Sequence, residues 1–168
     1  MDSYIRDKQS VNPDGTPSSP FNIMGVKVLY LNNIITRSGS VTELYRSDWS
    51  ELGIDPQHMI LVTMNANAVT DWHCHSKQTD HLIAISGNIK LCLWDNRKHS
   101  PTKNSTDTIR MGILRPQIAI VPPGVWHGLR NESGEPSHYI NINEVPYCYE
   151  NPDNLRVNAD SKDIPVSL

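Results

Sequence analysis

The chain has 168 residues, of which 38% are apolar and 20% charged, and its formal net charge is −3. That length supports one domain with a real hydrophobic core. The slightly acidic net charge gives no electrostatic reason to expect binding to nucleic acid or to an anionic membrane. No apolar run reaches the length of a membrane span, and the polar start does not resemble a signal peptide. We therefore expect neither a nucleic-acid nor a membrane partner.

The cysteines bear on the cellular compartment. Cys74, Cys92 and Cys148 are odd in number and stand at no spacing that is typical of a metal site. Free thiols persist in a reducing compartment, whereas disulfides form in an oxidising one. We therefore expect three free cysteines and a cytoplasmic protein.

The first 20 residues differ in composition from the rest of the chain. Residues 12–20 are rich in proline, glycine and serine, and the whole segment offers few apolar side chains to bury. We expect residues 1–20 to form a flexible N-terminal arm, either free or exchanged within a dimer. Residues 21–168 should then form a single folded domain.

Short apolar or alternating runs separated by glycine and proline turns follow one another through this domain. No segment keeps a helical period over three turns. This pattern predicts an all-β protein, either a barrel or a double-sheet jelly roll. The strands that we expect span residues 26–31, 41–46, 58–65, 81–86, 89–94, 111–114, 117–121 and 138–143.

Turn residues predict how some of these strands connect. Gly87 and Asn88 stand between two apolar runs, which is a hairpin signal, so we expect the runs on either side to pair. Residues 37–40 should form a turn. Residues 95–108 are polar and should form an irregular excursion from the sheet.

Three histidines and an aspartate are the candidate functional residues. His73 and His75 stand two apart in a run predicted as a strand, so both imidazoles should point to one face and Cys74 to the other. Asp80 follows a short polar turn, where a hairpin would bring its carboxylate back onto the histidines. His127 lies just after a proline–glycine turn and can add a third imidazole.

Imidazoles and a carboxylate on one face make either a metal site or a His–Asp acid–base site. Neighbouring buried histidines with a carboxylate are costly without a cation, and this favours the metal site over a metal-free polar interior. We predict that His73, His75, Asp80 and His127 hold a divalent metal ion. The donor set suits Fe(II), Mn, Ni or Zn and does not choose among them.

The spacing of these residues resembles the two cupin signatures, with aspartate where the first signature usually has glutamate. The first is matched by His73, His75, Asp80 and Gly87, and the second by Pro122, Gly124, His127 and Asn131. The resemblance implies a cupin double-stranded β-helix, which is a jelly-roll barrel, over residues 21–168. It also implies that the four candidate ligands face the barrel interior.

Within the cupins, residues 23–160 most resemble the dTDP-4-dehydrorhamnose 3,5-epimerase family. The resemblance rests on the motif Asp-x-Arg-x-x-Ser-Pro-Thr at residues 95–102, the run at 120–128, and Tyr-x-Tyr followed by Pro-Asp at 147–153. It implies an enzyme that acts on a small molecule, such as a nucleotide-sugar, and that forms a homodimer.

The same resemblance implies catalytic roles. In that family a strand histidine removes a proton beside a sugar ketone, and a tyrosine serves as the acid; His75 and Tyr139 match these residues. An aspartate near the end of the chain supports the histidine, and Asp160 is the candidate here. If His75 binds a metal it cannot accept a proton, and the role of base then passes to Tyr139 or to a metal-bound hydroxide.

The chain departs from the epimerase pattern at two cations. The family has arginine where this chain has Trp72, and lysine where it has Asp80. In the family those cations hold the nucleotide-sugar and stabilise the enolate. A metal ion can supply the missing positive charge as a Lewis acid. The sequence therefore resembles an epimerase that carries a metal-type cupin site.

Three functions follow from this sequence. The first is a metal-binding epimerase or isomerase that acts next to a carbonyl of a sugar-like substrate. The second is an Fe(II)-dependent cupin oxygenase or lyase, which would use the same four ligands. The third is a non-catalytic cupin that binds a small molecule.

Several other residues have a structural and a functional interpretation. Trp72, Trp94 and Trp126 more simply pack the barrel than stack on a ligand. Arg97 either shapes a substrate loop or pairs with Asp95. The basic residues that we consider for holding a substrate anion are Arg46, Lys90 and Arg115.

Overall fold

The computed structural model describes residue 6, residues 9–14 and residues 21–168. Most of the predicted arm, residues 1–20, lies outside these described residues, so its flexibility stays a prediction. The described part of the chain forms strands and no helices, so it contains no helix that could span a membrane.

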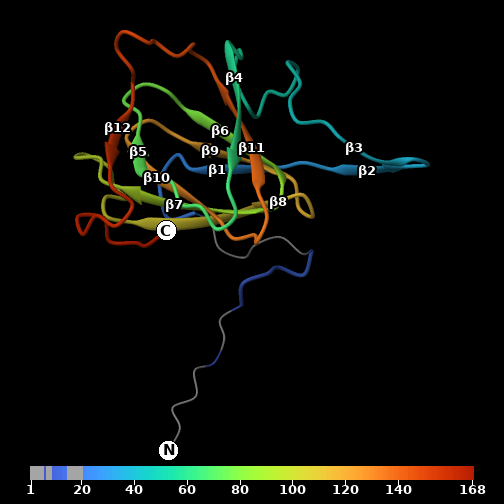
Figure 1. The fold of residues 1–168 in the computed structure, drawn as a ribbon, viewed down its shortest axis with the longest axis horizontal. Helices are drawn as coiled ribbons and strands as arrows, with labels where there is room; N and C mark the ends of the chain where they lie inside the picture. The colour runs from blue at the N-terminus through green and yellow to red at the C-terminus, as the bar shows by residue number, and fades with distance from the viewer. Residues whose placement is uncertain (1–5, 7–8, 15–20) are drawn as a thin grey trace, which may run out of the picture.

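Two five-stranded antiparallel sheets form the barrel (Figure 1). The first has the order β1 (Lys27–Tyr30), β9 (Gln117–Val121), β6 (Asp80–Ser86), β11 (Ser137–Asn143) and β4 (His58–Met64). The second has the order β12 (Leu155–Val157), β5 (Trp72–Cys74), β10 (Val125–Asn131), β7 (Asn88–Asp95) and β8 (Thr106–Gly112). Consecutive strands often belong to different sheets, which is the winding of a jelly roll. The predicted all-β jelly-roll fold is confirmed.

A small ribbon of β2 (Asn33–Thr36) and β3 (Gly39–Thr42) projects from the barrel (Figure 1). Thr36 pairs with Gly39, so the turn is tighter than the predicted one at residues 37–40. The strand predicted over residues 41–46 was wrong beyond Thr42. Strand β2 was not predicted from the sequence. All four of its residues are exposed, so they show no alternation of apolar and polar side chains.

The predicted irregular excursion at residues 95–108 was also wrong in part, because β8 begins inside it. Ile109 and Met111 are buried on β8 with polar neighbours between them, as in a half-buried strand. The alternation was hidden by Asp107, a buried carboxylate that accepts hydrogen bonds from the backbone N–H groups of Asn22 and Ile23 at 3.0 and 2.8 Å. The strand predicted at residues 111–114 ends at Gly112.

The predicted hairpin at Gly87 and Asn88 was wrong. Strands β6 and β7 belong to different sheets, so the chain turns a corner there instead of reversing within one sheet. Gly87 has a φ of +67°, and a Cβ atom on it would lie 1.9 Å from the Oγ atom of Ser137. Glycine is required at this corner by both the backbone conformation and the lack of space.

The predicted hairpin between His75 and Asp80 was wrong for a similar reason. Strand β5 lies in the second sheet and β6 in the first, so residues 75–79 cross from one sheet to the other. The crossing nevertheless places the carboxylate of Asp80 beside the ring of His75. The two side chains are therefore close, as predicted, although the route of the chain differs.

Three apolar clusters stabilise the barrel. One fills its interior between the sheets and includes Leu82, Leu91 and Leu129. Another covers the outer face of the first sheet with residues from the segment 44–54. The last lies on the outer face of the second sheet, beneath the C-terminal segment.

Trp72, Trp94 and Trp126 belong to this last cluster. Trp72 is fully buried, and Trp94 and Trp126 pack against the same cluster with Leu168 from the end of the chain. The tryptophans therefore pack the protein, as predicted, but on the outside of the sheet and not within the barrel. Alternation along β5 then points His73 inward.

The motif at residues 95–102 is a structural network. Asp95 is fully buried, and its carboxylate accepts hydrogen bonds from Arg97 at 2.8 Å, Ser100 at 2.6 Å and Thr102 at 2.7 Å. Arg97 also donates to the carbonyl of Met24 at 2.8 Å. These contacts support the structural interpretation, in which Arg97 pairs with Asp95.

Candidate functional site

A pocket of about 470 Å³ opens at one end of the barrel. Its walls include the inward faces of β4 and β11, the strand β12, and the segment of residues 145–154. His73, His75 and Tyr139 line it, so the pocket contains residues of both the predicted metal site and the predicted catalytic pair.

The four predicted ligands converge beside this pocket. Each of His73, His75, Asp80 and His127 offers one ligand atom, and these atoms all lie within 4.8 Å of one another. His73 and His127 are directly paired residues of β5 and β10, and their ring centroids are 4.0 Å apart. Asp80 and His127 are each 1% exposed. The structure therefore brings together all four residues from three strands and one crossing loop.

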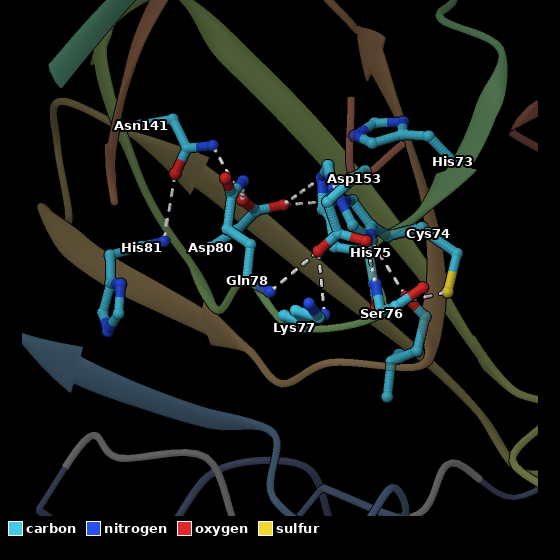
Figure 2. A network of polar contacts seen from close by, with 12 residues as sticks. His73, Cys74, His75, Ser76, Lys77, Gln78, Asp80, His81, Asn141 and Asp153 are labelled. Carbon is cyan, nitrogen blue, oxygen red and sulfur yellow. Dashed lines mark hydrogen bonds and ion pairs between the residues drawn. The ribbon is translucent and has the colours of Figure 1, made fainter. Parts of the chain in front are cut away.

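Asp80 lies at the centre of this cluster. Its Oδ2 atom is 2.9 Å from Nε2 of His127 and 3.3 Å from Nε2 of His75. Its Oδ1 atom accepts hydrogen bonds from Gln78 at 2.6 Å and from Asn141 at 2.9 Å (Figure 2). Burial alone would raise the pKa of Asp80, but hydrogen bonds and charge from the two histidines hold it well below its usual value.

Backbone carbonyls orient all three imidazole rings. A carbonyl can only accept, so each Nδ1 atom must carry a proton, and each Nε2 atom is left to face the cluster. The donor–acceptor pairs are His73 with Asp71 at 3.3 Å, His127 with Val125 at 3.0 Å, and His75 with Asp153. Histidines that ligate metals are commonly held in this way through the other ring nitrogen.

The rings of His75 and His127 each face an oxygen acceptor at both nitrogens. A neutral imidazole has one N–H and can donate to only one of these two acceptors. The contact at its other nitrogen is repulsive unless a second proton or a metal ion adds positive charge there. Nε2 of His127 is buried and makes no hydrogen bond of good geometry with any described residue. The cluster therefore calls for an added positive charge, which either a proton or a metal ion could supply.

The pKa values of the other two histidines shift in opposite directions. Burial, and then the nearby His127, lowers the pKa of His73 to about 3, so this ring is neutral at neutral pH. Burial also acts against the charged form of His75, but its hydrogen bond to Asp80 and the charge of that carboxylate raise its pKa above the usual value.

Tyr139 lies on the inward face of β11 and is 8% exposed. Burial, and then the charge of Asp80, raises its pKa to about 12, so the phenol keeps its proton at neutral pH. Its side chain lines the same pocket as His73 and His75. Tyr139 can therefore act as a proton donor within the pocket.

Other sequence-based candidates lie elsewhere. Asp160 is exposed, and the residue that contacts the ring of His75 is Asp153, through its backbone carbonyl. The basic residues considered for a substrate anion do not line the pocket. Arg46 pairs with Asp48 and Glu43, Lys90 reaches the carbonyl of Ser167, and Arg115 lies over the ring of Tyr30.

The basic residues that do line the pocket were missed. They are Lys77, in the loop after His75, and Arg156, on β12. Arg156 is paired with His73 across the two strands, so both side chains lie on the same face of the sheet. Lys77 stood within the histidine motif and could have been considered. Arg156 had no such signal, because β12 is three residues long and follows an irregular segment.

Comparison with known proteins shows the family of this chain through its relatives, although no family model matches it. It is 35% identical over 140 residues, or 83% of this chain and 90% of the relative, to the probable low-salt glycan biosynthesis epimerase Agl13 of Haloferax volcanii. The chain belongs to the RmlC-like cupin epimerases. It is also 30% identical to the spore coat polysaccharide biosynthesis protein SpsL of Bacillus subtilis, over 84% of this chain and 93% of that one.

Solved structures of RmlC-like epimerases share the fold. A dTDP sugar isomerase from Desulfovibrio desulfuricans G20 superposes with a TM-score of 0.82 at 22% identity, over 89% of this chain and 94% of that chain. The dTDP-4-dehydrorhamnose 3,5-epimerase of Bacillus anthracis, solved with TDP and pyrophosphate, has a TM-score of 0.75 at 19% identity, over 88% and 86%. The predicted cupin fold and family are confirmed.

Proposed function

We propose that this protein is an epimerase or isomerase that moves a proton on the carbon next to a carbonyl of a sugar, most simply a nucleotide-linked sugar. The cluster of His73, His75, Asp80 and His127 beside the pocket carries this proposal, because it can hold a cation where a substrate would bind. The relatives in glycan and polysaccharide biosynthesis support a sugar substrate. Solved neighbours with TDP or dTDP bound support a nucleotide-sugar.

The donor set of the cluster fits a divalent metal ion. Three imidazoles whose Nε2 atoms face the cluster, together with one carboxylate, match the ligand preferences of Fe(II), Mn, Ni and Zn. The buried Nε2 of His127, which has no hydrogen-bond partner among the described residues, is an atom that such an ion would satisfy. When bound, a divalent cation supplies positive charge that polarises a substrate carbonyl and stabilises an enolate.

That charge would replace two cations of the epimerase pattern. The resembled family has arginine and lysine where this chain has Trp72 and Asp80. Trp72 is fully buried in the outer cluster, so its position cannot serve a substrate. Asp80 adds a negative charge to the interior, and a metal ion would reverse the sign of the local field.

Proton transfer would fall to Tyr139 and His75. Tyr139 keeps its proton at neutral pH and can return it to the substrate as a general acid. His75 can accept a proton at Nε2 only while that atom is not used as a ligand. We propose that in the metal-free protein the neutral form of His75 removes the proton and Tyr139 returns one. In the loaded protein His75 would be a ligand, and the deprotonated form of Tyr139 would remove the proton and return it as the phenol.

The polar lining of the pocket supports a hydroxyl-rich substrate. The Oδ1 atoms of Asn143 and Asn154 are buried and have no hydrogen-bond partner in the described structure. A buried polar atom without a partner costs about 1–3 kcal/mol, so a ligand or water that donates to it would be favoured. Sugar hydroxyls are such donors. Lys77 and Arg156 can hold an anionic group of the same substrate.

We also propose a homodimer. The outer face of β4 exposes Met59 and Leu61 at 57% and 61%, and β4 ends its sheet with one edge unpaired by any described strand. The projecting ribbon exposes Ile34, Ile35 and Val41 at 55%, 80% and 54%. A second copy would cover these apolar surfaces. Light scattering should give twice the mass of the chain, and a monomer at micromolar concentration would contradict this.

We propose that residues 21–168 form one cupin domain. Cys74 and Cys92 are buried free thiols and Cys148 is an exposed one, which fits a reducing compartment such as the cytoplasm. Burial raises the pKa of Cys74 to about 11, so its thiol is unreactive at neutral pH.

Solvent exchange tests the proposed reaction. The metal-loaded protein is incubated anaerobically in deuterated buffer with a dTDP-linked 4-keto-6-deoxy sugar, and deuterium on the carbons beside the ketone is followed by mass spectrometry. We expect exchange that is lost in Tyr139→Phe. Oxygen consumption that depends on Fe(II), without exchange, would instead favour an oxygenase. Binding without either reaction would leave a non-catalytic sugar-binding cupin.

A further inference from the structure

Asp153 binds the loop after His75 with both its side chain and its main chain (Figure 2). Its carboxylate accepts hydrogen bonds from the backbone N–H groups of Ser76 at 2.7 Å, Lys77 at 2.8 Å and Gln78 at 3.1 Å. Its backbone carbonyl accepts the Nδ1–H of His75. One residue thus fixes both the ring and the loop that follows it.

This contact matters because the loop has, among the described residues, one other backbone hydrogen bond, from the N–H of Gly124 to the carbonyl of His75 at 2.7 Å, and no strand pairing beyond it. Residues 75–79 lie between β5 and β6, outside both strands, so no ladder of sheet hydrogen bonds holds them. An unpaired backbone N–H needs a partner when water is excluded. A carboxylate that accepts three N–H groups forms charge-assisted hydrogen bonds, which are stronger than neutral ones. Asp153 therefore takes the place of strand pairing at the point where the chain crosses between the sheets.

His75 differs in this respect from the other two histidines. The carbonyl that orients His73 belongs to Asp71, and the one that orients His127 belongs to Val125, each two residues earlier in the same segment. The carbonyl that orients His75 is 78 residues away. The ring of His75 is thus the one in the cluster whose direction depends on a distant segment of the chain.

That distant segment also forms the rim of the pocket. Val145, Tyr147 and Asn151 line the pocket and belong to the stretch between β11 and β12, which ends just after Asp153. Movement of this rim would be transmitted to Asp153 and from there to the ring of His75.

We propose that Asp153 is a positioning residue, which holds Nε2 of His75 toward Asp80 and links the pocket rim to the cluster. The relevance of this His75 orientation to function rests on the proposed role of the cluster in the reaction. The orientation of His75 itself can be measured without metal or substrate.

Nuclear magnetic resonance of the metal-free protein, labelled with ¹⁵N-histidine, tests this orientation. We expect slowly exchanging Nδ1–H signals from His75 and His127 in the wild type. Asp153→Ala removes the carboxylate and should speed exchange at His75 at least about 10-fold, with His127 unchanged. Asp153→Asn keeps one acceptor oxygen and should give an intermediate rate. Asp160→Asn, at an exposed site, is the matched control.

Equal protection of His75 in the wild type and in both Asp153 variants would overturn the proposal. Circular dichroism and thermal unfolding establish that each variant is folded. If Asp153→Ala does not fold, Asp153→Asn alone decides: its His75 signal must exchange faster than that of the wild type.

A second measurement tests whether Asp153 also affects the binding of a metal ion. The affinity for Co²⁺ and Zn²⁺ is measured by titration, with the Co²⁺ absorption bands as a record of the ligand geometry. We expect Asp153→Ala to bind about 10–100-fold more weakly with altered bands, as is typical when a partner of a ligating histidine is lost. If the wild type binds neither ion, the metal part of the proposed function fails, whereas the resonance experiment still decides the role of Asp153. Unchanged affinity and bands in Asp153→Ala would contradict the proposed link.

Discussion

The Nε2 atom of His127 lies 2.9 Å from the Oδ2 atom of Asp80, and both side chains are buried. Because the Nδ1 atom of the same ring donates to the carbonyl of Val125, a neutral His127 presents a lone pair to the carboxylate. Two acceptors in contact within a barrel repel each other unless a cation lies with them. A proton can meet this requirement in the metal-free protein, and a metal ion can meet it in the loaded one.

Changing His127 tests this relationship. We expect His127→Ala to weaken metal binding at least about 100-fold, because it removes a buried ligand and opens a cavity. The measurement is a competition titration with a Zn²⁺ chelator of known affinity. His138→Ala serves as control, since His138 lies on the outward side of β11 and bonds to Ser86. Equal metal affinity in the wild type and His127→Ala would exclude His127 as a ligand.

The pKa of His73 predicts a loss of stability in acid. The folded value is about 3, whereas an unfolded histidine titrates near about 6.5. The unfolded chain therefore binds a proton first as the pH falls, and the free energy of unfolding should drop between these values, by about 3 kcal/mol at pH 4. Urea unfolding of metal-free protein at several pH values measures this. The drop should be smaller in His73→Gln, and an identical profile would contradict the prediction.

The raised pKa of His75 predicts the opposite trend at higher pH. A raised pKa stabilises the fold fully below the unfolded value, near about 6.5, and this contribution is lost as the pH rises through the folded value. The metal-free wild type should therefore lose stability as the pH rises above about 6.5, and His75→Gln should not. The same urea series gives the answer. A steeper alkaline loss in the variant than in the wild type would be inconsistent with the charged ring that faces Asp80.

Tyr139→Phe tests the proposed acid. The hydroxyl lines the pocket and makes no hydrogen bond with the described residues, so we expect the free energy of unfolding to change by less than about 1 kcal/mol. The rate of deuterium exchange into the keto-sugar should fall by about 10²–10⁴-fold, with little change in KM. Tyr45→Phe, in the outer cluster of the first sheet, is the control. A variant with full exchange activity would remove Tyr139 from the mechanism.

Replacing Asn143 by an apolar residue should weaken substrate binding without lowering stability. Its Oδ1 atom is buried without a partner among the described residues, so Asn143→Leu should leave the substrate-free protein as stable as before or slightly more stable. If a substrate hydroxyl donates to this atom, the same change should weaken substrate binding by about 10-fold. Calorimetry with the dTDP-linked sugar and thermal unfolding measure the two effects. Loss of stability together with unchanged binding would indicate a structural amide.

Gly87 tests the corner between the two sheets. Its φ is positive, and a Cβ atom at this position would lie 1.9 Å from the Oγ atom of Ser137, so there is no room for a side chain. We expect Gly87→Ala to lower the free energy of unfolding by more than about 1 kcal/mol. Gly134→Ala is a matched control, because no atom lies within 4 Å of the Cβ position there. Equal stability of the two variants would contradict the steric account.

The sequence was sufficient for the fold and for the identity of the clustered residues. Alternation put His73 and His75 on one face, and the spacing to Asp80 and His127 matched two cupin signatures. What it did not supply was the path of the chain. Gly87 looked like a hairpin turn because a sharp turn within a sheet and a corner between sheets use the same residues.

The support of the cluster was also invisible in the sequence. Asp153 acts through a backbone carbonyl, which every residue has, and the choice of residue matters through contacts with a loop far away in sequence. Arg156 reaches the pocket because a three-residue strand pairs with β5. Asp107 is a buried carboxylate that interrupted the apolar period of β8. Each of these depends on tertiary contacts and not on local pattern.

Elemental analysis tests the central claim of a metal-bearing cluster most directly. The protein is purified without chelator or histidine tag, and Fe, Mn, Ni and Zn are measured in the wild type, in Asp80→Asn and in Asp160→Asn. The cluster predicts close to one metal ion per chain in the wild type and in Asp160→Asn, and none in Asp80→Asn. A wild type that stays metal-free after incubation with each of these ions would contradict the claim and leave His75 and Tyr139 as a metal-free acid–base pair.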